Sequence, residues 1–170
     1  MAGTEKVKIK QVLQVGVVVK DLQKAMEHYW NILGIGPWHI YTFQPPFVSN
    51  TTLRGKPAPY TMRLALTQVG NIQWELIQPL DGPSIYKEFL EQKGGGLHHV
   101  ACDMGDYDQA VAALKKHGID ILMSGATPVD TFAQMDTEKD LGTGIEIYKR
   151  PAKFKLPPPE AIYPPSAGAR

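Results

Sequence analysis

The chain consists of two halves that repeat the same order of elements, and this repeat restricts the folds open to it. The matched positions are a polar residue on a first strand, an aspartate at a helix start, an alanine within the helix and, after a gap of one residue, a glycine at its end: Gln14 with His99, Asp21 with Asp106, Ala25 with Ala110, and Gly34 with Gly118. Each half is therefore expected to form one strand–helix–strands unit. The duplication also predicts that equivalent positions of the two units meet.

In the first half, runs of apolar and β-branched residues predict four strands. They are expected at Gln11–Val19, Trp38–Phe43, Tyr60–Val69 and Asn71–Gln78, the last two joined by a tight turn at Gly70 and Asn71. Asp21 is expected to cap a helix that ends at Gly34. The proline-rich stretch Gln44–Pro59 is expected to be a loop or an irregular excursion, and Pro83–Lys93 a short helix.

The second half repeats this order from Leu97 onward. Strands are expected at Leu97–Met104, Ile119–Met123, Thr131–Asp136 and Thr143–Arg150, with a helix capped by Asp106 that ends at His117 and Gly118. The predicted organisation is a flexible N-terminus (1–10), a first module with a linker helix (11–93), a second module (94–150) and a proline-rich, extended tail (151–170).

Composition excludes several classes of function. A net charge of +1, with 43% apolar and 21% charged residues, offers no field for nucleic acid or lipid headgroups. The single cysteine, Cys102, fits a reducing compartment, and neither a signal peptide nor a run long enough to span a membrane is evident. We expect a cytoplasmic protein that acts on a small molecule, without nucleic acid or membrane as a partner.

Three consecutive glycines, Gly94 to Gly96, precede a strand that begins with two histidines. Glycines in a row indicate a connection with unusual backbone angles. Because successive strand residues point to opposite faces, His98 and His99 are not expected to face the same way. One of them is expected to line a site while the other packs or meets solvent.

Each half also carries a glutamate among large apolar neighbours on its last strand, Glu75 in the first and Glu146 in the second. A buried carboxylate without a partner is costly, and a divalent cation would remove that cost. Gln14 and His99, at equivalent places on the first strands, would add an amide oxygen and an imidazole nitrogen. The alternative is that each glutamate pairs with a lysine or arginine at an exposed strand edge. Four such residues at equivalent positions favour the metal.

The sequence resembles the vicinal oxygen chelate superfamily of glyoxalases, epimerases and extradiol dioxygenases over roughly Gln11 to Arg150. The likeness to methylmalonyl-CoA epimerases rests on Gly70–Leu80 (GNIQWELIQPL) and on Gly94–Ala101 (GGGLHHVA). The resemblance implies an α+β fold in which two βαβββ modules form a curved mixed sheet around a metal-binding cleft. It further implies one divalent ion (Zn, Mn, Co, Ni or Mg) held by Gln14, Glu75, His99 and Glu146.

The resemblance implies isomerase, epimerase or lyase chemistry through a metal-bound enolate. The substrate would be a small enolisable carbonyl compound: a 2-oxo acid, a hydroxyketone or an acyl thioester. Two departures qualify the likeness to the epimerases. Gln14 stands where they usually have histidine, which is the pattern of certain glyoxalase I enzymes, and Tyr60–Ala65 lacks the carboxylate that serves them as base. In glyoxalase I a metal-bound glutamate is also the base, and Glu146 is the corresponding candidate here.

Further residues are candidates for substrate binding. Arg63 would bind a substrate carboxylate, and the pocket candidates are His39, Tyr41 and Gln134. The superfamily commonly forms homodimers, and the apolar strand Val15–Val19 would allow one. Two alternatives to the enzyme remain: a small-molecule-binding protein of the antibiotic-resistance type, and an enzyme of unrelated chemistry on the same scaffold.

Overall fold

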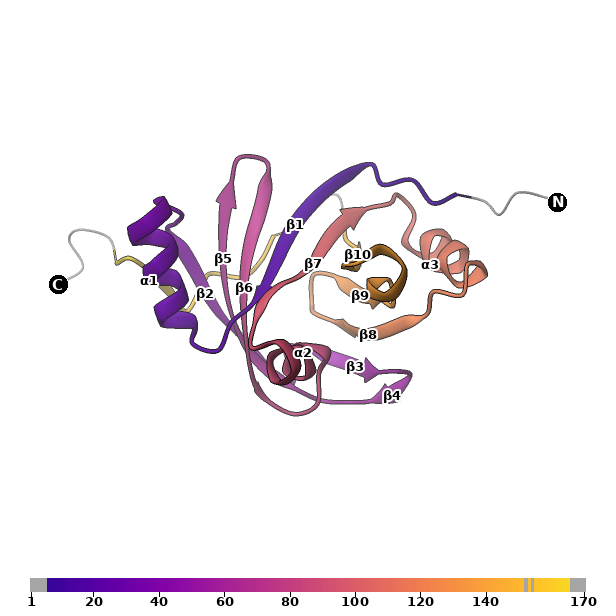
Figure 1. Cartoon of the computed structure of the whole chain (residues 1–170), viewed down its shortest axis with the longest axis horizontal. Coiled ribbons are helices and arrows are strands. Elements are labelled where there is room, and N and C mark those ends of the chain that lie inside the picture. The colour runs from indigo at the N-terminus through magenta and orange to yellow at the C-terminus, as the bar shows by residue number, and fades with distance from the viewer. Residues whose placement is uncertain (1–5, 152, 154, 166–170) are drawn as a thin grey trace.

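A computed structural model describes residues 6–151, 153 and 155–165 of the chain. Within these residues, a single mixed sheet of eleven strands curves through the molecule in the order β11-β2-β5-β6-β1-β7-β10-β9-β8-β3-β4 (Figure 1). The predicted α+β class with a curved mixed sheet is confirmed.

The two predicted modules form the two halves of this sheet. The first contains β1 (Gln11–Val18), α1 (Leu22–Leu33), β2 (Trp38–Phe43), β5 (Thr61–Val69) and β6 (Ile72–Asp81). The second contains β7 (Gly96–Asp103), α3 (Tyr107–Lys116), β8 (Ile121–Ala126), β9 (Thr131–Met135) and β10 (Gly144–Lys149). α2 (Ile85–Lys93) links them, and the halves join where β1 pairs antiparallel with β7.

Strand register shows that the modules are structural copies. In the first, β1 runs parallel to β6 and Gln14 lies opposite Gln73, so Glu75 is two residues further along. In the second, β7 runs parallel to β10 and His99 lies opposite Gly144, so Glu146 is likewise two residues further along. Gln14 and His99 are therefore equivalent, as are Glu75 and Glu146.

One helix covers the outer face of each half, and both begin at the predicted cap. The Asp21 Oδ1 atom accepts a hydrogen bond from Lys24 N at 3.0 Å, and Asp106 Oδ1 accepts one from Gln109 N at 2.8 Å. α1 packs its apolar side on the strands of the first module, and α3 does so on the second. In Figure 1 the two helices lie at opposite ends of the molecule. The other face of the sheet is thus left for a third apolar cluster and the site described below.

Substituting Met26 by alanine tests the packing of α1. Met26 is 1% exposed and packs with Trp38 and Leu76, so truncation should lower the free energy of unfolding by about 2–5 kcal/mol. Leu33, on the same helix but 63% exposed, is the matched control, and its change to alanine should cost less than about 0.5 kcal/mol. Chemical denaturation of both variants measures the difference. Equal losses would contradict this packing.

The prediction that Gln44–Pro59 is a loop was wrong in part. It contains β3 (Ser49–Leu53) and β4 (Lys56–Pro57), and β3 pairs with β8 at the edge of the second module. β11 (Ala161–Tyr163), in the tail, pairs with β2 at the edge of the first module. In both segments, strand pairing satisfies backbone N–H and C=O groups that would otherwise bind water. Neither segment alternates apolar and polar residues, so the sequence does not predict these strands. The short α4 (Glu138–Leu141) was also not predicted.

The first strand lies in the middle of the sheet, with β6 on one side and β7 on the other. Val15–Val18 therefore offers no free strand edge to a second copy, which removes the reason given for expecting a homodimer; the dimer itself stays a prediction. Of the N-terminus expected to be flexible, residues 1–5 lie outside the described part, and Lys10 N donates to Asp103 O at 2.8 Å. No helix among the described residues is long and apolar enough to cross a membrane.

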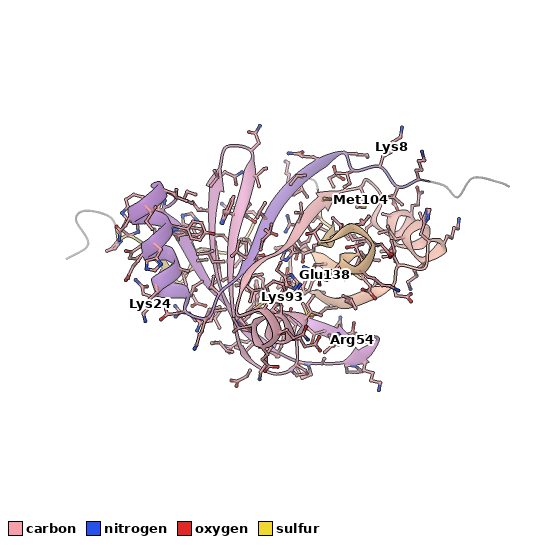
Figure 2. The ribbon with its side chains drawn as sticks, viewed as in Figure 1. Lys8, Lys24, Arg54, Lys93, Met104 and Glu138 are labelled. Atoms are coloured by element: carbon pink, nitrogen blue, oxygen red, sulfur yellow. The ribbon has the colours of Figure 1, made fainter. Side chains whose placement is uncertain are left out.

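Two ion pairs connect α2 to neighbouring segments, one to the residue after β3 and one to α4. Glu88 accepts two hydrogen bonds from the Arg54 guanidinium, at 2.8 and 2.7 Å, just beyond β3. Lys93 pairs with Glu138 of α4, and Figure 2 shows these two side chains next to each other. All four side chains are substantially exposed, so each pair contributes about 1 kcal/mol or less. They help to fix α2 beside the junction of the two modules.

Candidate functional site

The four residues predicted as metal ligands converge at the junction of the modules. Alternation along β6 places Glu75 on the face opposite Leu76, which packs under α1, and alternation along β10 does the same for Glu146 and the α3-facing Ile147. All four are almost completely inaccessible: 3% exposed for Gln14, 7% for Glu75, 0% for His99 and 4% for Glu146. The alternative that the glutamates lie at an exposed strand edge is therefore wrong.

His99 faces both carboxylates. Its Nε2 atom lies 3.2 Å from Glu146 Oε2 and 3.6 Å from Glu75 Oε2, yet this fully buried nitrogen has no hydrogen-bond partner. On the other side of the ring, His99 Nδ1 lies 3.1 Å from His98 Nδ1. His98 itself packs edge-on against Tyr86 and Phe89. His99 thus lies beside the two glutamates while His98 packs on α2, and the role of His99 at a site stays a prediction.

Gly16 provides the space for the His99 ring. The two residues lie opposite each other on β1 and β7. A Cβ atom on Gly16 would stand 2.1 Å from His99 Cε1 and 2.5 Å from His99 Nε2, distances that no side chain tolerates. The φ of Gly16 is not in the left-handed region, so glycine is not needed here for its backbone freedom. It is needed because it has no side chain that would overlap the His99 ring.

The amide of Gln14 is oriented by two neighbours on the same face. Its Nε2 donates to Gln73 Oε1 at 2.8 Å, and its Oε1 accepts from the Tyr148 hydroxyl at 2.6 Å. The same hydroxyl donates to Glu146 Oε2 at 2.5 Å. The hydroxyl has one proton and donates to one of these oxygens at a time, but it lies within hydrogen-bond distance of both, so Tyr148 ties Gln14 of one module to Glu146 of the other.

Burial and charge shift the acid–base properties of this cluster. Burial raises the pKa of Glu75, with the nearby Glu146 adding to the effect and His99 opposing it. Burial alone would lower the pKa of His99, but Glu146 and Glu75 outweigh it and raise that pKa. Burial also lowers the pKa of His98 to about 3, which keeps its imidazole neutral at neutral pH. Burial thus favours the neutral form of the Glu75 carboxyl, and a positive charge beside it would favour the carboxylate.

The donor set fits a hard divalent metal in its chemistry. Two carboxylates, an amide oxygen and an imidazole nitrogen converge, and the unpartnered His99 Nε2 is directed at the carboxylates. Adjacent ligands of one ion at roughly 2.0–2.2 Å would lie about 3 Å apart. The distances from His99 Nε2 to Glu146 Oε2 and Glu75 Oε2, 3.2 and 3.6 Å, are close to this value. Across residues 6–151, 153 and 155–165, no group of three or more His, Cys, Asp or Glu side chains is already arranged to hold an ion. Gln14 Oε1 and Glu146 Oε2, which would bind the ion, are instead hydrogen-bonded to the Tyr148 hydroxyl.

A cavity of about 40 Å³, room for about three water molecules, lies beside Gln14, Glu75 and Glu146. Most of its wall is apolar and comes from both modules and α2: Phe43, Met62, Leu64, Leu66, Tyr86 and Phe132. A polar group formed by Thr127, Asp130 and Arg150 closes another part of the wall. The cavity thus combines ionisable polar groups with a largely apolar wall.

Arg150 is the cation of this cavity wall. Its Nε donates to Asp130 Oδ2 at 2.9 Å, and its guanidinium lies 3.4 Å from the centre of the Tyr148 ring. Asp130 also accepts a hydrogen bond from the Thr127 hydroxyl at 2.7 Å. Asp130, Arg150 and Tyr148 were not predicted as site residues, although Tyr148 lies two residues after Glu146 and so on the same strand face.

The structure separates the residues predicted to bind substrate. Arg63 lies between Met62 and Leu64 on β5 and does not line the cavity, so its position gives no support to a role in carboxylate binding. His39 and Tyr41 line a neighbouring groove of about 470 Å³. Gln134 does not line the cavity; it lies opposite Glu146 in the sheet and lines a separate groove, and its Nε2 donates to the Tyr86 hydroxyl at 3.2 Å.

Comparison with known proteins identifies the family of this chain and several relatives. The model of the Glyoxalase/Bleomycin resistance protein/Dioxygenase superfamily matches residues 13–136. The uncharacterized protein YqjC of Bacillus subtilis is 29% identical over 64% of this chain and 67% of its own length. The mitochondrial methylmalonyl-CoA epimerase of Bos taurus is 32% identical over 66% of this chain. The match spans 57% of that bovine enzyme.

The crystal structure of methylmalonyl-CoA epimerase from Mycobacterium tuberculosis has a similar fold. The TM-score is 0.64 at 24% sequence identity, with 84% of this chain and 89% of that chain covered. At this identity the likeness concerns the fold alone.

Proposed function

Because the chain belongs to the glyoxalase/bleomycin resistance protein/dioxygenase superfamily, we propose that it is a metal-dependent isomerase or epimerase. Its substrate would be a small enolisable carbonyl compound, with acyl-CoA thioesters the first class to test because the bovine relative is a methylmalonyl-CoA epimerase. One observation carries the proposal: Gln14, Glu75, His99 and Glu146, from equivalent positions of two modules, converge next to a largely apolar cavity.

These four residues would hold the metal through Gln14 Oε1, His99 Nε2 and one oxygen from each glutamate. When bound, a divalent ion supplies Lewis acidity that stabilises negative charge developing on a substrate carbonyl oxygen. His98 supports His99 from behind at 3.1 Å, and Gln73 keeps the Gln14 amide turned toward Tyr148 and Glu146.

Glu146 is the residue proposed to move the proton. Glu146 lines the cavity, and its Oε2 accepts a hydrogen bond from the Tyr148 hydroxyl. The other carboxylate of the polar wall, Asp130, is engaged by Arg150 and by Thr127, so it is less free to act as a base. The Tyr148 hydroxyl would hold the Glu146 carboxylate in place by donating to it, and would be able to accept a hydrogen bond from the carboxylic acid after proton transfer.

The rest of the cavity would orient the substrate and exclude water. Phe43, Met62, Leu64 and Phe132 present apolar surface to a substrate side chain. With few competing waters in so small a space, the electrostatic effects of Glu146 and His99 are stronger than in bulk solvent.

Gln14 favours a second candidate, a glyoxalase I-like lyase. The donor set of one glutamine, two glutamates and one histidine resembles that of certain glyoxalase I enzymes, and β5 supplies no second carboxylate. Both candidates use the same proton transfer, so they are separated by their substrates: thiohemiacetals for the lyase, acyl thioesters for the epimerase.

The proposal is tested by metal analysis followed by hydrogen–deuterium exchange. We expect one Mn, Co, Ni, Mg or Zn ion per chain after reconstitution, and exchange of the hydrogen beside the carbonyl in at least one member of a panel of acyl-CoA thioesters, 2-oxo acids and hydroxyketones. Proton NMR in D₂O follows the exchange. A protein that binds no divalent ion, or one that binds it without exchanging any compound, would contradict the proposal; in the second case a binding protein is the better description.

A further inference from the structure

The segment 155–163, which we call the strap, crosses from the cavity to the far edge of the sheet. It follows the second module in the chain, yet its β11 pairs with β2 of the first module, with Ala161 opposite Ile40 and Tyr163 opposite Trp38. The superfamily model ends at residue 136, so the strap lies outside the matched region. Neither the family nor the proposed chemistry accounts for it.

The strap is fastened to β2 by more than strand pairing. The Glu160 carboxylate accepts hydrogen bonds from Thr42 N at 2.8 Å and from the Thr42 hydroxyl at 3.0 Å, and Glu160 N donates to Ile40 O at 2.9 Å. Tyr163 packs against the apolar cluster under α1. The charge-assisted hydrogen bonds between Glu160 and Thr42 therefore fix the strap four residues after Leu156, which lines the cavity.

At its other end the strap places Leu156 against the cavity. Leu156 packs on the central apolar cluster and lines both the inner cavity of about 40 Å³ and the outer groove of about 470 Å³. The two spaces share three described lining residues, Leu66, Gln73 and Leu156. The first two belong to strands of the sheet and form a common floor. Leu156 comes from outside the sheet and borders both spaces.

We propose that Leu156 is a specificity-determining residue that limits the length of the substrate group accepted beside the metal centre. The proposal rests on the proposed function, because it assumes that substrate oxygens are held near Glu75 and Glu146. With leucine, the inner cavity ends at the strap. With a smaller residue, the cavity would continue into the outer groove, and longer apolar groups would gain buried surface there.

Alkyl hydroxamates test the proposal without turnover, because they present two adjacent oxygens to a metal and carry chains of any chosen length. Binding of the acetyl to octanoyl members to the Ni-loaded full chain is measured by titration calorimetry. We expect the wild type to bind the short members and to bind the long ones at least tenfold more weakly. In Leu156→Ala the affinity should instead rise about fourfold for each added methylene.

Two further variants complete the design. Ile162→Ala removes a similar apolar group from the same strap at a position 41% exposed and away from the cavity, and it should keep the wild-type length profile. Glu160→Ala removes the fastening to Thr42 and should relax discrimination in the same direction as Leu156→Ala, which guards against a folding defect in one variant.

The outcomes are distinguishable. An unchanged length profile in both Leu156→Ala and Glu160→Ala, or an equal change in Ile162→Ala, would overturn the role of the strap while leaving the proposed function intact. A wild-type protein that takes up no divalent ion and binds no hydroxamate would overturn the proposed function, and the role of Leu156 with it.

Discussion

Changing Glu146 to glutamine is expected to slow substrate hydrogen–deuterium exchange by about 10²- to 10⁴-fold, even with metal in excess. Glutamine keeps the size of the side chain and can still offer an oxygen to a metal and to Tyr148. It cannot accept the proton that a carboxylate oxygen takes. The exchange rate is measured by proton NMR while the metal concentration is raised to saturation.

Two matched variants separate the role of a base from that of a ligand. Glu75→Gln makes the same change at the equivalent position of the other module, and its exchange rate should recover as metal is added, because only affinity is lost. Glu138→Gln, at an exposed glutamate paired with Lys93, should leave exchange unchanged. If excess metal restored Glu146→Gln to the wild-type rate, Glu146 would be a ligand alone and the base would lie elsewhere.

Changing Gly16 to alanine is expected to weaken divalent-metal binding by at least about 100-fold. The substitution leaves all four proposed ligands in the chain but displaces the His99 ring. The new Cβ would overlap His99 at 2.1 Å, and the ring has little room to move because it is fully buried with His98 behind it. Overpacking of this kind should also lower the free energy of unfolding by about 1–3 kcal/mol. Calorimetric metal titration and chemical denaturation measure the two effects.

Gly118→Ala is the control for the loss of stability. Gly118 has a φ of +78° and open space around it, so alanine there should cost about 1–2 kcal/mol from backbone strain and leave metal affinity unchanged. In the double variant Gly16→Ala/His99→Ala, the losses in stability should be less than additive, because the clash is gone. Additive losses would show that His99 is not what Gly16 accommodates.

The candidate centre could be predicted because it is built from strands and from a repeat. Alternation along a strand decides which residues share a face, and duplication pairs Gln14 with His99 and Glu75 with Glu146. The same alternation also applies to two residues that were not predicted as part of the site. Gln73 lies two residues before Glu75 and Tyr148 two residues after Glu146, so both share the face of the glutamates, and both are hydrogen-bonded in the cluster.

Residues supplied by irregular segments could not be found in this way. Asp130 reaches the cavity from the connection between β8 and β9, and Leu156 from the strap, and neither segment has a periodic pattern that points inward. Arg63 shows what residue chemistry alone leaves open. Its guanidinium suits a substrate carboxylate, but its neighbours Met62 and Leu64 line the cavity and Arg63 does not, so its role in binding stays a prediction.

The amino-acid sequence by itself determined the two modules, their capped helices and the four residues that equivalent positions would bring together, because local periodicity and duplication act over short stretches of chain. Only the tertiary structure decided which spaces lie beside those residues. β3 pairs with β8, and β11 pairs with β2, which lies more than a hundred positions earlier in the chain. Such pairing depends on free strand edges that exist only once the sheet has formed. The strap, the position of Leu156 beside the cavity and the space that Gly16 leaves for His99 all follow from contacts between distant segments, which no local pattern encodes.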